Sequence, residues 1–357
     1  MQSKVKKINF KGYNIYSGID VHEKSWKVTI MVGDKYYKTL TMVPKAENLE
    51  KYLAREFPGG SYYTAYEAGF CGFSIHRKLE EKGIRNMVVN PADIPTTDKD
   101  RSQKEDRRDS RKIAKSLKNG DLTAIYVPEK ELEELRSLVR YRKSVSRDLA
   151  REKNRIKSFL KIYGIEEPEE ISKIRSWSSK YVKWLEGIEM DTEYGKMVIE
   201  ERIETIKFLR EKKLKVQREL QKVSLESKYR EDIELLRSVT GIGRIVSITL
   251  LTELIDINRF KTLDQLCSYI GLIPRTNSSG EKERHGRITR RSNKEIRSVL
   301  IESSWVAIRQ DPALMLKYNE LIKRMKGSEA IVRIAKKLLN RIRYVLKNRK
   351  KYERSIV

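Results

Sequence analysis

The sequence has few cysteines and no long apolar run, and each shortage excludes a class of protein. Only two cysteines occur among 357 residues, Cys71 and Cys267, and they lie far apart without metal-ligand spacing. This excludes a disulfide framework or a zinc cluster and fits a reducing compartment. The longest apolar run, residues 245–255, is too short to cross a bilayer, and the first fourteen residues lack the apolar core of a signal peptide. We therefore expect a cytoplasmic protein.

Acidic residues are heavily outnumbered by basic ones. There are 77 Lys+Arg against 50 Asp+Glu, a formal net charge of +27. This excess is larger than solubility requires, and it predicts a polyanionic partner. The basic residues occur throughout the chain rather than in one tail. Such a distribution favours nucleic acid over an anionic membrane surface as the partner.

Residues 13–32 predict two adjacent strands with an acid at their junction. Ile15, Ser17 and Ile19 fall on one face of the first strand, and Asp20 leaves its end on the other face. The alternation resumes after a short polar break, as expected for a paired, half-buried strand. Asp20 either begins a turn or meets a cation, because a carboxylate there is costly without a positive partner.

The following segments alternate between strand and helix. Patterns and breakers predict strands over 36–43, 61–66 and 85–90, and helices over 46–57, 73–83 and 104–120. Glu67 stands directly after the fourth strand. This order describes a mixed sheet flanked by helices, with acids at the strand ends. It is the plan of the ribonuclease H-like fold.

The helix predicted over 104–120 contributes two more acids. Asp106 and Asp109 are three residues apart near its start, so they share one face. Acids in a first turn can simply complement the helix dipole. Together with Asp20 and Glu67, however, they make four carboxylates in a strongly basic protein. Carboxylates suit Mg²⁺, and a pair of such ions can activate and stabilise oxygens in phosphoryl transfer. The sequence therefore predicts a magnesium site.

The middle of the chain predicts two long helices. Residues 129–163 and 196–240 contain neither proline nor glycine, and apolar residues recur there at mostly helical spacing. Helices of this length are expected to pair, either as an antiparallel arm within the chain or as a coiled coil between protomers. Trp177 and Trp184 lie in the segment that connects them.

The C-terminal part contains a glycine turn and a basic loop. Residues 238–254 resemble a helix-hairpin-helix, whose Gly241 and Gly243 could bring N–H groups to a phosphate or form a tight turn between core helices. In the loop that follows, Ser278 and Ser279 precede a glycine, where serine is commonly a turn residue. Five cations come next: Lys282, Arg284, Arg287, Arg290 and Arg291. The last helical pattern has one apolar face and one face dense in Lys and Arg, which suits phosphate contact.

Several spaced motifs resemble one known family. GIDVHEK, YEAGFCGFSIHRKL, VVNPADIP and KEDRRDSRKIA occur in that order in the N-terminal part. They resemble the DEDD-type transposases of insertion-sequence family one-hundred-ten, which are related to Piv-type DNA invertases. The segments TGIGRIVSITLLTEL and YIGLIPRTNSSGEKERHGRITRRSN resemble the second conserved domain of the same family. The resemblance covers both ends of the chain and leaves only the helical middle without a specific match.

The resemblance implies a set of functional residues. The N-terminal domain would be similar to the RuvC Holliday-junction resolvase, with metal-binding acids at Asp20, Glu67, Asp106 and Asp109. A catalytic serine precedes a glycine in the family, which corresponds to Ser279 here, and the preceding Ser278 leaves that register open. Ser110 stands where many members have alanine, a small change that should spare the helix.

The resemblance also implies partners. Members act as recombinases guided by a structured bridge RNA that pairs with donor and target DNA. They assemble as tetramers in which one protomer's acids and another's serine build each site. For this chain we therefore expect DNA, a guide RNA and a homo-oligomer, dimer or tetramer, in the cytoplasm at the nucleoid.

These observations predict an α/β plus α protein in three parts. Residues 1–128 would form the RuvC-like catalytic domain, residues 129–230 a helical coiled-coil arm, and residues 231–357 a mostly helical transposase domain with a helix-hairpin-helix-like element. The predicted function is a Mg²⁺-dependent DNA recombinase with a serine nucleophile. Two alternatives remain: a structure-specific endonuclease that hydrolyses DNA junctions, and a non-catalytic nucleic-acid-binding protein.

Overall fold

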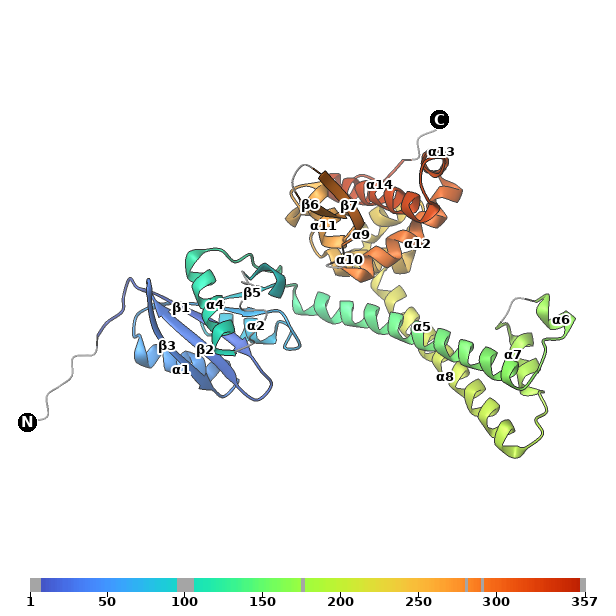
Figure 1. The fold of residues 1–357 in the computed structure, drawn as a ribbon, viewed down its shortest axis with the longest axis horizontal. Helices are drawn as coiled ribbons and strands as arrows, with labels where there is room; N and C mark the ends of the chain where they lie inside the picture. Colours follow the sequence, from blue (N-terminus) through green and yellow to red (C-terminus); the bar gives the residue numbers. More distant parts are fainter. Residues whose placement is uncertain (1–7, 95–105, 175–176, 280–281, 290–291, 354–357) are drawn as a thin grey trace, which may run out of the picture. The chain divides into compact units, whose positions relative to one another are not determined.

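The chain divides into two units, Met1–Val127 and Pro128–Val357. The computed structural model describes residues 8–94, 106–174, 177–279, 282–289 and 292–353, without the side chains of residues 106–108, 275–279 and 282–288. The division of the second unit into an arm and a C-terminal domain stays a prediction. Figure 1 shows the elements of each unit.

A mixed five-stranded sheet forms the centre of the first unit, as the sequence predicts. Its strand order is β3-β2-β1-β4-β5. β1 pairs antiparallel with β2 and parallel with β4, and β4 pairs parallel with β5. The strands are β1 (Asn14–Val21), β2 (Trp26–Val32), β3 (Lys35–Met42), β4 (Ser61–Glu67) and β5 (Arg85–Val89).

Helices cover both faces of this sheet. The face that carries Ile15 and Ile19 packs against Leu49 of α1 (Ala46–Glu56) and Leu79 of α2 (Ser74–Glu81). The other face packs against α4 (Asp106–Asn119), where Ile113 lies in one apolar cluster with Ala65 of β4. A short 3-10 helix, Pro91–Asp93, follows β5. Because burial on both faces excludes water, this sheet is a rigid support for side chains at its strand ends.

Two long helices pair within the second unit. They are α5 (Lys130–Ile162) and α8 (Glu193–Val223). Leu135 near the start of α5 packs with Leu220 near the end of α8, and Ile156 packs with Ile203 at the other end. The pair is therefore antiparallel and lies within one chain, which confirms the first of the two predicted arrangements. In the part of the chain described, α6 (Glu169–Ser172) and α7 (Ser179–Glu186) connect them.

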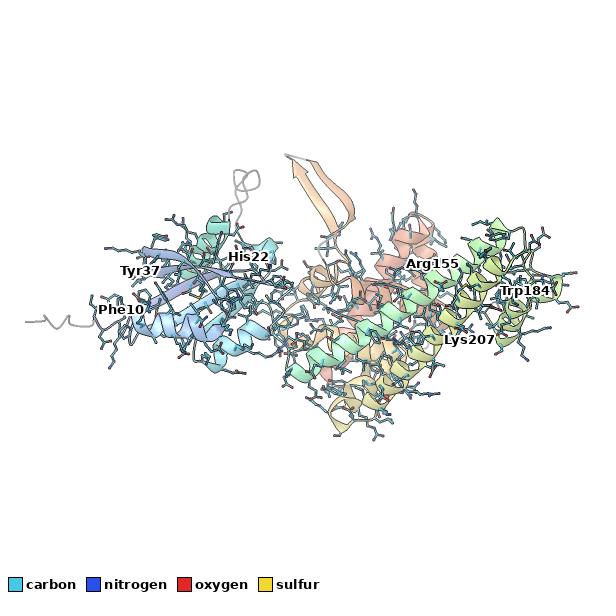
Figure 2. All side chains as sticks on the ribbon, turned by 90° about the horizontal axis from the view of Figure 1, so that it is seen from below. Phe10, His22, Tyr37, Arg155, Trp184 and Lys207 are labelled. Atoms are coloured by element: carbon cyan, nitrogen blue, oxygen red, sulfur yellow. The ribbon has the colours of Figure 1, made fainter. Side chains whose placement is uncertain are left out.

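The two tryptophans lie in this connection, as predicted. Trp177 and Trp184 pack against the apolar cluster at the tip of the helix pair, on either side of the buried Tyr181. Figure 2 shows Trp184 at this tip. Burial of large aromatic rings stabilises a connection that has little regular structure of its own.

The second long helix is shorter than predicted. The pattern over 196–240 contains no breaker, yet α8 ends at Val223 and a separate helix, α9 (Ser227–Ser238), follows. The Ser224 hydroxyl donates to the carbonyl of Gln221 at 2.6 Å, a local bond that competes with the helix. Leu236 of α9 then joins the C-terminal core. The prediction of one continuous helix was wrong, because tertiary packing rather than helix propensity decides where a helix ends.

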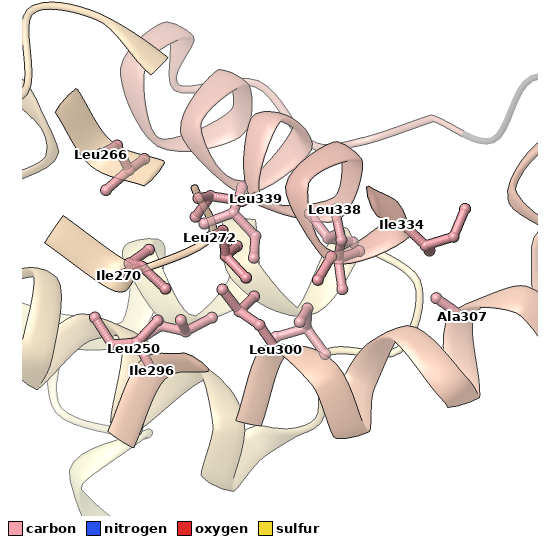
Figure 3. Close-up of a cluster of buried hydrophobic side chains, with 14 of the residues drawn as sticks. Leu250, Leu266, Ile270, Leu272, Ile296, Leu300, Ala307, Ile334, Leu338 and Leu339 are labelled. Atoms are coloured by element: carbon pink, nitrogen blue, oxygen red, sulfur yellow. The ribbon is translucent and has the colours of Figure 1, made fainter. Parts of the chain in front are cut away.

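The C-terminal core is built from helices on all sides. Figure 3 shows Leu250, Ile296, Leu300 and Leu338 meeting in it. The apolar face predicted for the last helix is confirmed, since Ile331, Ile334, Leu338, Ile342 and Val345 are all buried. The helices are α10 (Arg244–Leu254), α11 (Leu263–Ile270), α12 (Lys294–Gln310), α13 (Pro312–Ile322) and α14 (Gly327–Asn348), with a 3-10 helix at Ile257–Arg259.

The segment predicted as a basic loop contains a β-hairpin. β6 (Pro274–Ser279) pairs antiparallel with β7 (Lys282–Ile288), and Ser279 is opposite Lys282. The loop prediction was wrong because the two strands have no alternation of apolar and polar residues, the signal by which strands are recognised. No helix among the described residues has both the length and the apolar character that a membrane crossing requires.

Candidate active site and nucleic-acid interface

Two of the four acids stand at neighbouring strand ends. In the parallel pair β1–β4, Ile19 lies opposite Tyr66. Asp20 and Glu67 are the next residues on their strands. Parallel strands in register place aligned residues on the same face, so both carboxylates belong to the face that α4 covers. The side chain of Asp20 is 20% exposed and therefore lies at the rim of the unit rather than in its core.

Gly18 brings α4 close to this strand end. A Cβ atom at Gly18 would overlap the main-chain oxygen of Ser110 and the main chain of Ala114, both on α4. Only glycine permits this approach of a helix to a strand. Ser110 is fully buried, and its hydroxyl lies 2.9 Å from the hydroxyl of Thr29 on β2. The helix holds its predicted course through Ser110, which confirms that serine is compatible with it.

The same helix carries the other two acids. Asp109 directly precedes Ser110, and its carboxylate forms an ion pair with Lys112 at 3.5 Å. Asp106 is the first residue of α4, and its side chain lies outside the described residues. The close packing at Gly18 therefore brings the N-terminal turns of α4 to the sheet face from which Asp20 and Glu67 emerge.

His22 is a neighbour of the site that the sequence reasoning missed. Its Nε2 lies 3.1 Å from a carboxylate oxygen of Asp20. The ring is labelled in Figure 2 and is 47% exposed. The spacing of two residues, which keeps a strand side chain on one face, is the signal that could have identified it. Because a carboxylate oxygen only accepts, this hydrogen bond requires the His22 tautomer that carries a proton on Nε2.

The donor chemistry of this edge fits a hard cation. Carboxylate oxygens from two strand ends and one helix are the ligand type that Mg²⁺ prefers. Among the side chains that the structure describes, however, no three Asp, Glu, His or Cys residues come close enough to make a metal site. Asp106 is not one of those side chains. The fold thus brings the three acid-bearing elements β1, β4 and α4 together and leaves the complete four-acid site a prediction.

The candidate nucleophile belongs to the second unit. Ser279 is the last residue of β6, and Ser278 is opposite Glu283 in the hairpin. The base of the hairpin is anchored: Thr289 N–H donates to Ile273 at 3.2 Å, and Arg297 donates to the Thr289 carbonyl at 2.8 Å. The side chains of Ser278, Ser279, Lys282, Arg284 and Arg287, and the whole of Arg290 and Arg291, lie outside the described residues.

The two glycines of the predicted helix-hairpin-helix have different surroundings. Gly241 has a φ of +88°, and a Cβ there would come within 2.5 Å of the main-chain oxygen of Ser303 on α12. This glycine serves the tight turn between core helices. Gly243 has open space around its Cα and precedes the first turn of α10. The N–H groups at that helix start are the part of the turn that can meet a phosphate.

A basic groove lies between α13 and α14. Within the described residues, Arg333 and Lys337 have no ion-pair partner, and both are exposed on α14 one helical turn apart. Asn340 and Tyr344 continue the same stripe at helical spacing. The cations lining the groove are Lys317, Arg324, Arg333, Lys336, Lys337 and Arg341. Such a row of cations next to an exposed aromatic ring can track a phosphate backbone and stack a base.

Comparisons with known proteins give consistent results at both ends of the chain. A family model for the DEDD transposases of the IS110 group, described as Transposase, matches residues 17–165. A second model, described as Transposase IS116/IS110/IS902 family, matches residues 233–319. The first span contains the four acids and the second contains Ser279.

Individual relatives carry similar names. The chain is similar to the putative transposase y4qE of Sinorhizobium fredii, with 31% identity over 243 residues, which cover 68% of this chain and only 58% of that relative. It is 27% identical over 357 residues to the putative transposase y4rJ of the same organism, covering 91% of this chain and 90% of that one. The transposase for insertion sequence element IS1533 of Leptospira borgpetersenii is 23% identical over 253 residues, 70% of this chain and 71% of its own.

Proposed function

Because the chain belongs to the IS116/IS110/IS902 family of transposases, we propose that it cleaves and rejoins DNA strands to move an insertion sequence. The observation that carries the proposal is the placement of Asp20 and Glu67 at adjacent strand ends under the N-terminal turns of α4. Carboxylates at the exposed ends of adjacent strands stand where a scissile phosphate can approach from solvent, as the proposed RuvC-like site requires.

In this proposal the four acids hold a divalent cation, with Mg²⁺ expected from the all-oxygen donor set. When bound, the cation would polarise the phosphate and offset the charge that develops on it. The chain's own residues set the geometry. Gly18 lets α4 approach β1, and the Thr29–Ser110 contact joins α4 to β2. His22, at 3.1 Å from Asp20, orients that carboxylate by hydrogen bonding.

Ser279 is the proposed nucleophile. Its hydroxyl attacks a DNA phosphorus, so that a serine–phosphate bond forms and a phosphate–sugar bond breaks. The serine gives up its proton, and the departing DNA oxygen takes one up. The phosphoserine ester conserves the energy of the broken bond, so a second DNA hydroxyl can reverse the step and rejoin strands without ATP. Hydrolysis by water would lose that energy.

The proposed partners are DNA and a structured guide RNA. The formal charge of +27 and the α13–α14 groove support a large polyanionic ligand. Purification of the protein from a host that carries the whole element should bring a discrete RNA with it. Unchanged recombination rate and site choice after RNase treatment would count decisively against guidance. The proposal also includes a homo-oligomer, dimer or tetramer, in which one protomer's acids and another's Ser279 share a site.

A trapped reaction tests the nucleophile. Wild-type protein incubated with DNA and Mg²⁺ should give a covalent adduct on a denaturing gel. Ser279→Ala should lose the adduct and recombination while retaining DNA binding, because only one hydroxyl is removed. Ser278→Ala is the matched control and should retain both. An adduct that persists in Ser279→Ala and disappears in Ser278→Ala would move the nucleophile by one residue.

The same experiment separates the two alternative functions. A structure-specific endonuclease would cut DNA junctions without an adduct and without rejoined product. A non-catalytic binding protein would cut nothing at any metal concentration. Mixing Ser279→Ala with Asp20→Asn protein should restore part of the activity if protomers share sites. No restoration in the mixture would indicate that each chain uses its own acids and serine.

A further inference from the structure

A buried acid lies where the arm meets the C-terminal core. Glu253, near the end of α10, is only 1% exposed, although it interrupts the most apolar segment of the chain. Both of its carboxylate oxygens are satisfied by Arg140 of α5: Nε donates at 2.7 Å and a terminal nitrogen at 2.9 Å. A bidentate pair with arginine is the arrangement that best offsets the cost of a buried carboxylate.

The second partner of Glu253 belongs to the segment after the hairpin. The side-chain N–H₂ of Asn293 donates to Glu253 at 2.8 Å and to the hydroxyl of Tyr269 at 3.3 Å. The Tyr269 hydroxyl in turn donates to the main-chain oxygen of Glu253 at 3.1 Å. Asn293 also caps α12, because its side-chain oxygen accepts the N–H groups of Glu295 and Ile296 at 3.1 Å each. One asparagine thus joins α10, α11 and the start of α12.

Asn293 lies next to the foot of the β6–β7 hairpin, by which we mean Ile273 just before β6 and Thr289 just after β7. Its main-chain N–H donates to Tyr269 at 2.9 Å, four residues before Ile273, where β6 is about to begin. Thr289, directly after β7, donates to Ile273. Arg297 of α12 clamps the Thr289 carbonyl at 2.8 Å. Both feet of the hairpin are therefore held by residues that contact Asn293 or the helix it caps.

The arm helix contacts this foot at more than one point. Arg136 of α5 donates to the Thr252 carbonyl at 2.9 Å. Lys143 and Arg147, also on α5, reach Glu295 in the first turn of α12 at 2.6 and 3.4 Å. Four cations on one face of α5 thus bind the end of α10 and the start of α12. Of the two carboxylates that they contact, Glu253 is buried and Glu295 is partly exposed. A shift of α5 would break or lengthen these bonds together.

We propose that Glu253 is a positioning residue that couples the arm to the hairpin bearing Ser279. Held by Arg140, its carboxylate fixes Asn293, and Asn293 sets the hairpin foot relative to α12. The orientation of the strand that ends at Ser279 then depends on where α5 lies. The inference rests on the proposed function only in taking Ser279 as the nucleophile. The coupling itself concerns the protein without substrate.

Hydrogen exchange on the full-length protein tests the coupling directly. Arg140→Met removes both donors to Glu253 and leaves a methylene stem. Because the Arg140 side chain is 53% exposed, this change opens no cavity in the core. Amide exchange in β6, β7 and residue 293 should become about tenfold faster, since both charge-assisted bonds to the buried carboxylate are lost. Glu253→Gln should act in the same direction. Arg151→Met is the control on the same helix, because Arg151 pairs only with the exposed Asp148 among the described residues.

A second readout separates positioning from simple loss of stability. Arg140→Met should form the Ser279 adduct about tenfold more slowly while DNA affinity changes less than about twofold, because misplacing a reacting group costs rate rather than binding. Arg140→Lys keeps the positive charge and should restore part of the adduct rate and of the protection.

Two results would overturn the inference. One such result is amide exchange in the hairpin that is no faster in Arg140→Met and Glu253→Gln than in Arg151→Met. It would show that the contacts of Glu253 with Arg140 and Asn293 do not hold the hairpin in place. Exchange that rises equally in α13 and α14 would show a general loss of stability instead. If the wild-type protein forms no adduct at all, the proposed nucleophile is wrong, and the exchange result alone then decides whether Glu253 positions the hairpin.

Discussion

The hydroxyl of Ser110 lies 2.9 Å from the hydroxyl of Thr29, joining the helix that carries Asp106 and Asp109 to the sheet that carries Asp20. Thr29 also lies 2.7 Å from Thr39 on β3. Gly18 is the reason the helix comes this close, because a Cβ atom there would overlap the Ser110 main chain. Gly18 thus sets how closely the helix approaches the sheet, and the hydroxyl pair adds one contact between them.

Gly18→Ala should displace α4 and destabilise the first unit by about 2 kcal/mol, as overpacking against main-chain atoms does. Strand transfer should be lost with it. The measurement is amide exchange in β1 and α4 of the full-length protein. Gly69→Ala is the control, since the nearest atom to a Cβ there is 4.0 Å away and its φ is not positive. Equal protection in the two variants would mean that α4 does not depend on Gly18.

Ser110→Ala should be much milder than Gly18→Ala. The hydroxyl of Thr29 keeps Thr39 as a partner at 2.7 Å, so Thr29 is not left unpaired. We expect a loss below about 1 kcal/mol and nearly unchanged strand transfer. Urea titration together with a recombination assay measures both quantities. A loss as large as that of Gly18→Ala would assign α4 positioning to the hydroxyl pair instead.

Neutralising any of the four acids should abolish strand transfer without unfolding the protein. The variants are Asp20→Asn, Glu67→Gln, Asp106→Asn and Asp109→Asn, and the reason is that each removes a charged oxygen ligand from the cation. Chelation of divalent ions should have the same effect on the wild type and should be reversed by Mg²⁺. Asp121→Asn, at an exposed acid just after α4, is the control. Near-normal recombination in any two of the four variants would rule out the four-acid site.

The α14 stripe should contribute to nucleic-acid affinity in a salt-dependent way. Replacing Arg333 and Lys337 together by glutamine should weaken binding and reduce the slope of log affinity against log salt by roughly one to two units. Lys130 and Lys173, two exposed cations at opposite ends of the arm, provide a control that removes the same charge. The measurement is titration of fluorescent DNA and RNA at several salt concentrations. Equal slopes for the two double variants would reject a specific role for the groove.

The tip of the arm should lose stability at alkaline pH. Burial raises the pKa of Tyr181 above its ordinary value of 10.0, and the Glu167 carboxylate, which accepts its hydroxyl proton at 2.6 Å, raises this pKa further. A pKa raised in the folded state contributes stability that is complete below pH 10 and is lost as the pH rises through the folded value. Amide exchange in α7 should therefore accelerate above about pH 10 relative to its intrinsic rate.

Tyr181→Phe is the matched variant, because it keeps the ring and removes the ionisable hydroxyl. Its α7 exchange should lose most of the alkaline acceleration. Tyr163→Phe, at an exposed tyrosine of the same arm, should behave like the wild type. If all three proteins accelerate equally, the alkaline loss comes from groups other than Tyr181.

The sequence by itself determined the elements whose side chains face a core. Alternation in β1 and β2, apolar spacing in α5 and α14, and glycine or proline at the ends predicted these elements within a few residues, because burial selects residue type position by position. The acid motifs at Asp20, Glu67 and Asp109 could also be read locally, since each stands at the end of a strand or the start of a helix.

Only the tertiary structure decided what depends on contacts between distant segments. The hairpin from Pro274 to Ile288 has no apolar alternation, so its pairing is supplied by main-chain bonds and by a foot held from α12. The break after Val223 comes from packing of α9 into the C-terminal core. Glu253 interrupts an apolar run in the sequence, and only its approach to Arg140, 113 residues away, makes it a satisfied buried charge. Local patterns record which residues are buried, whereas the partner of a buried charge is fixed only when the whole chain has folded.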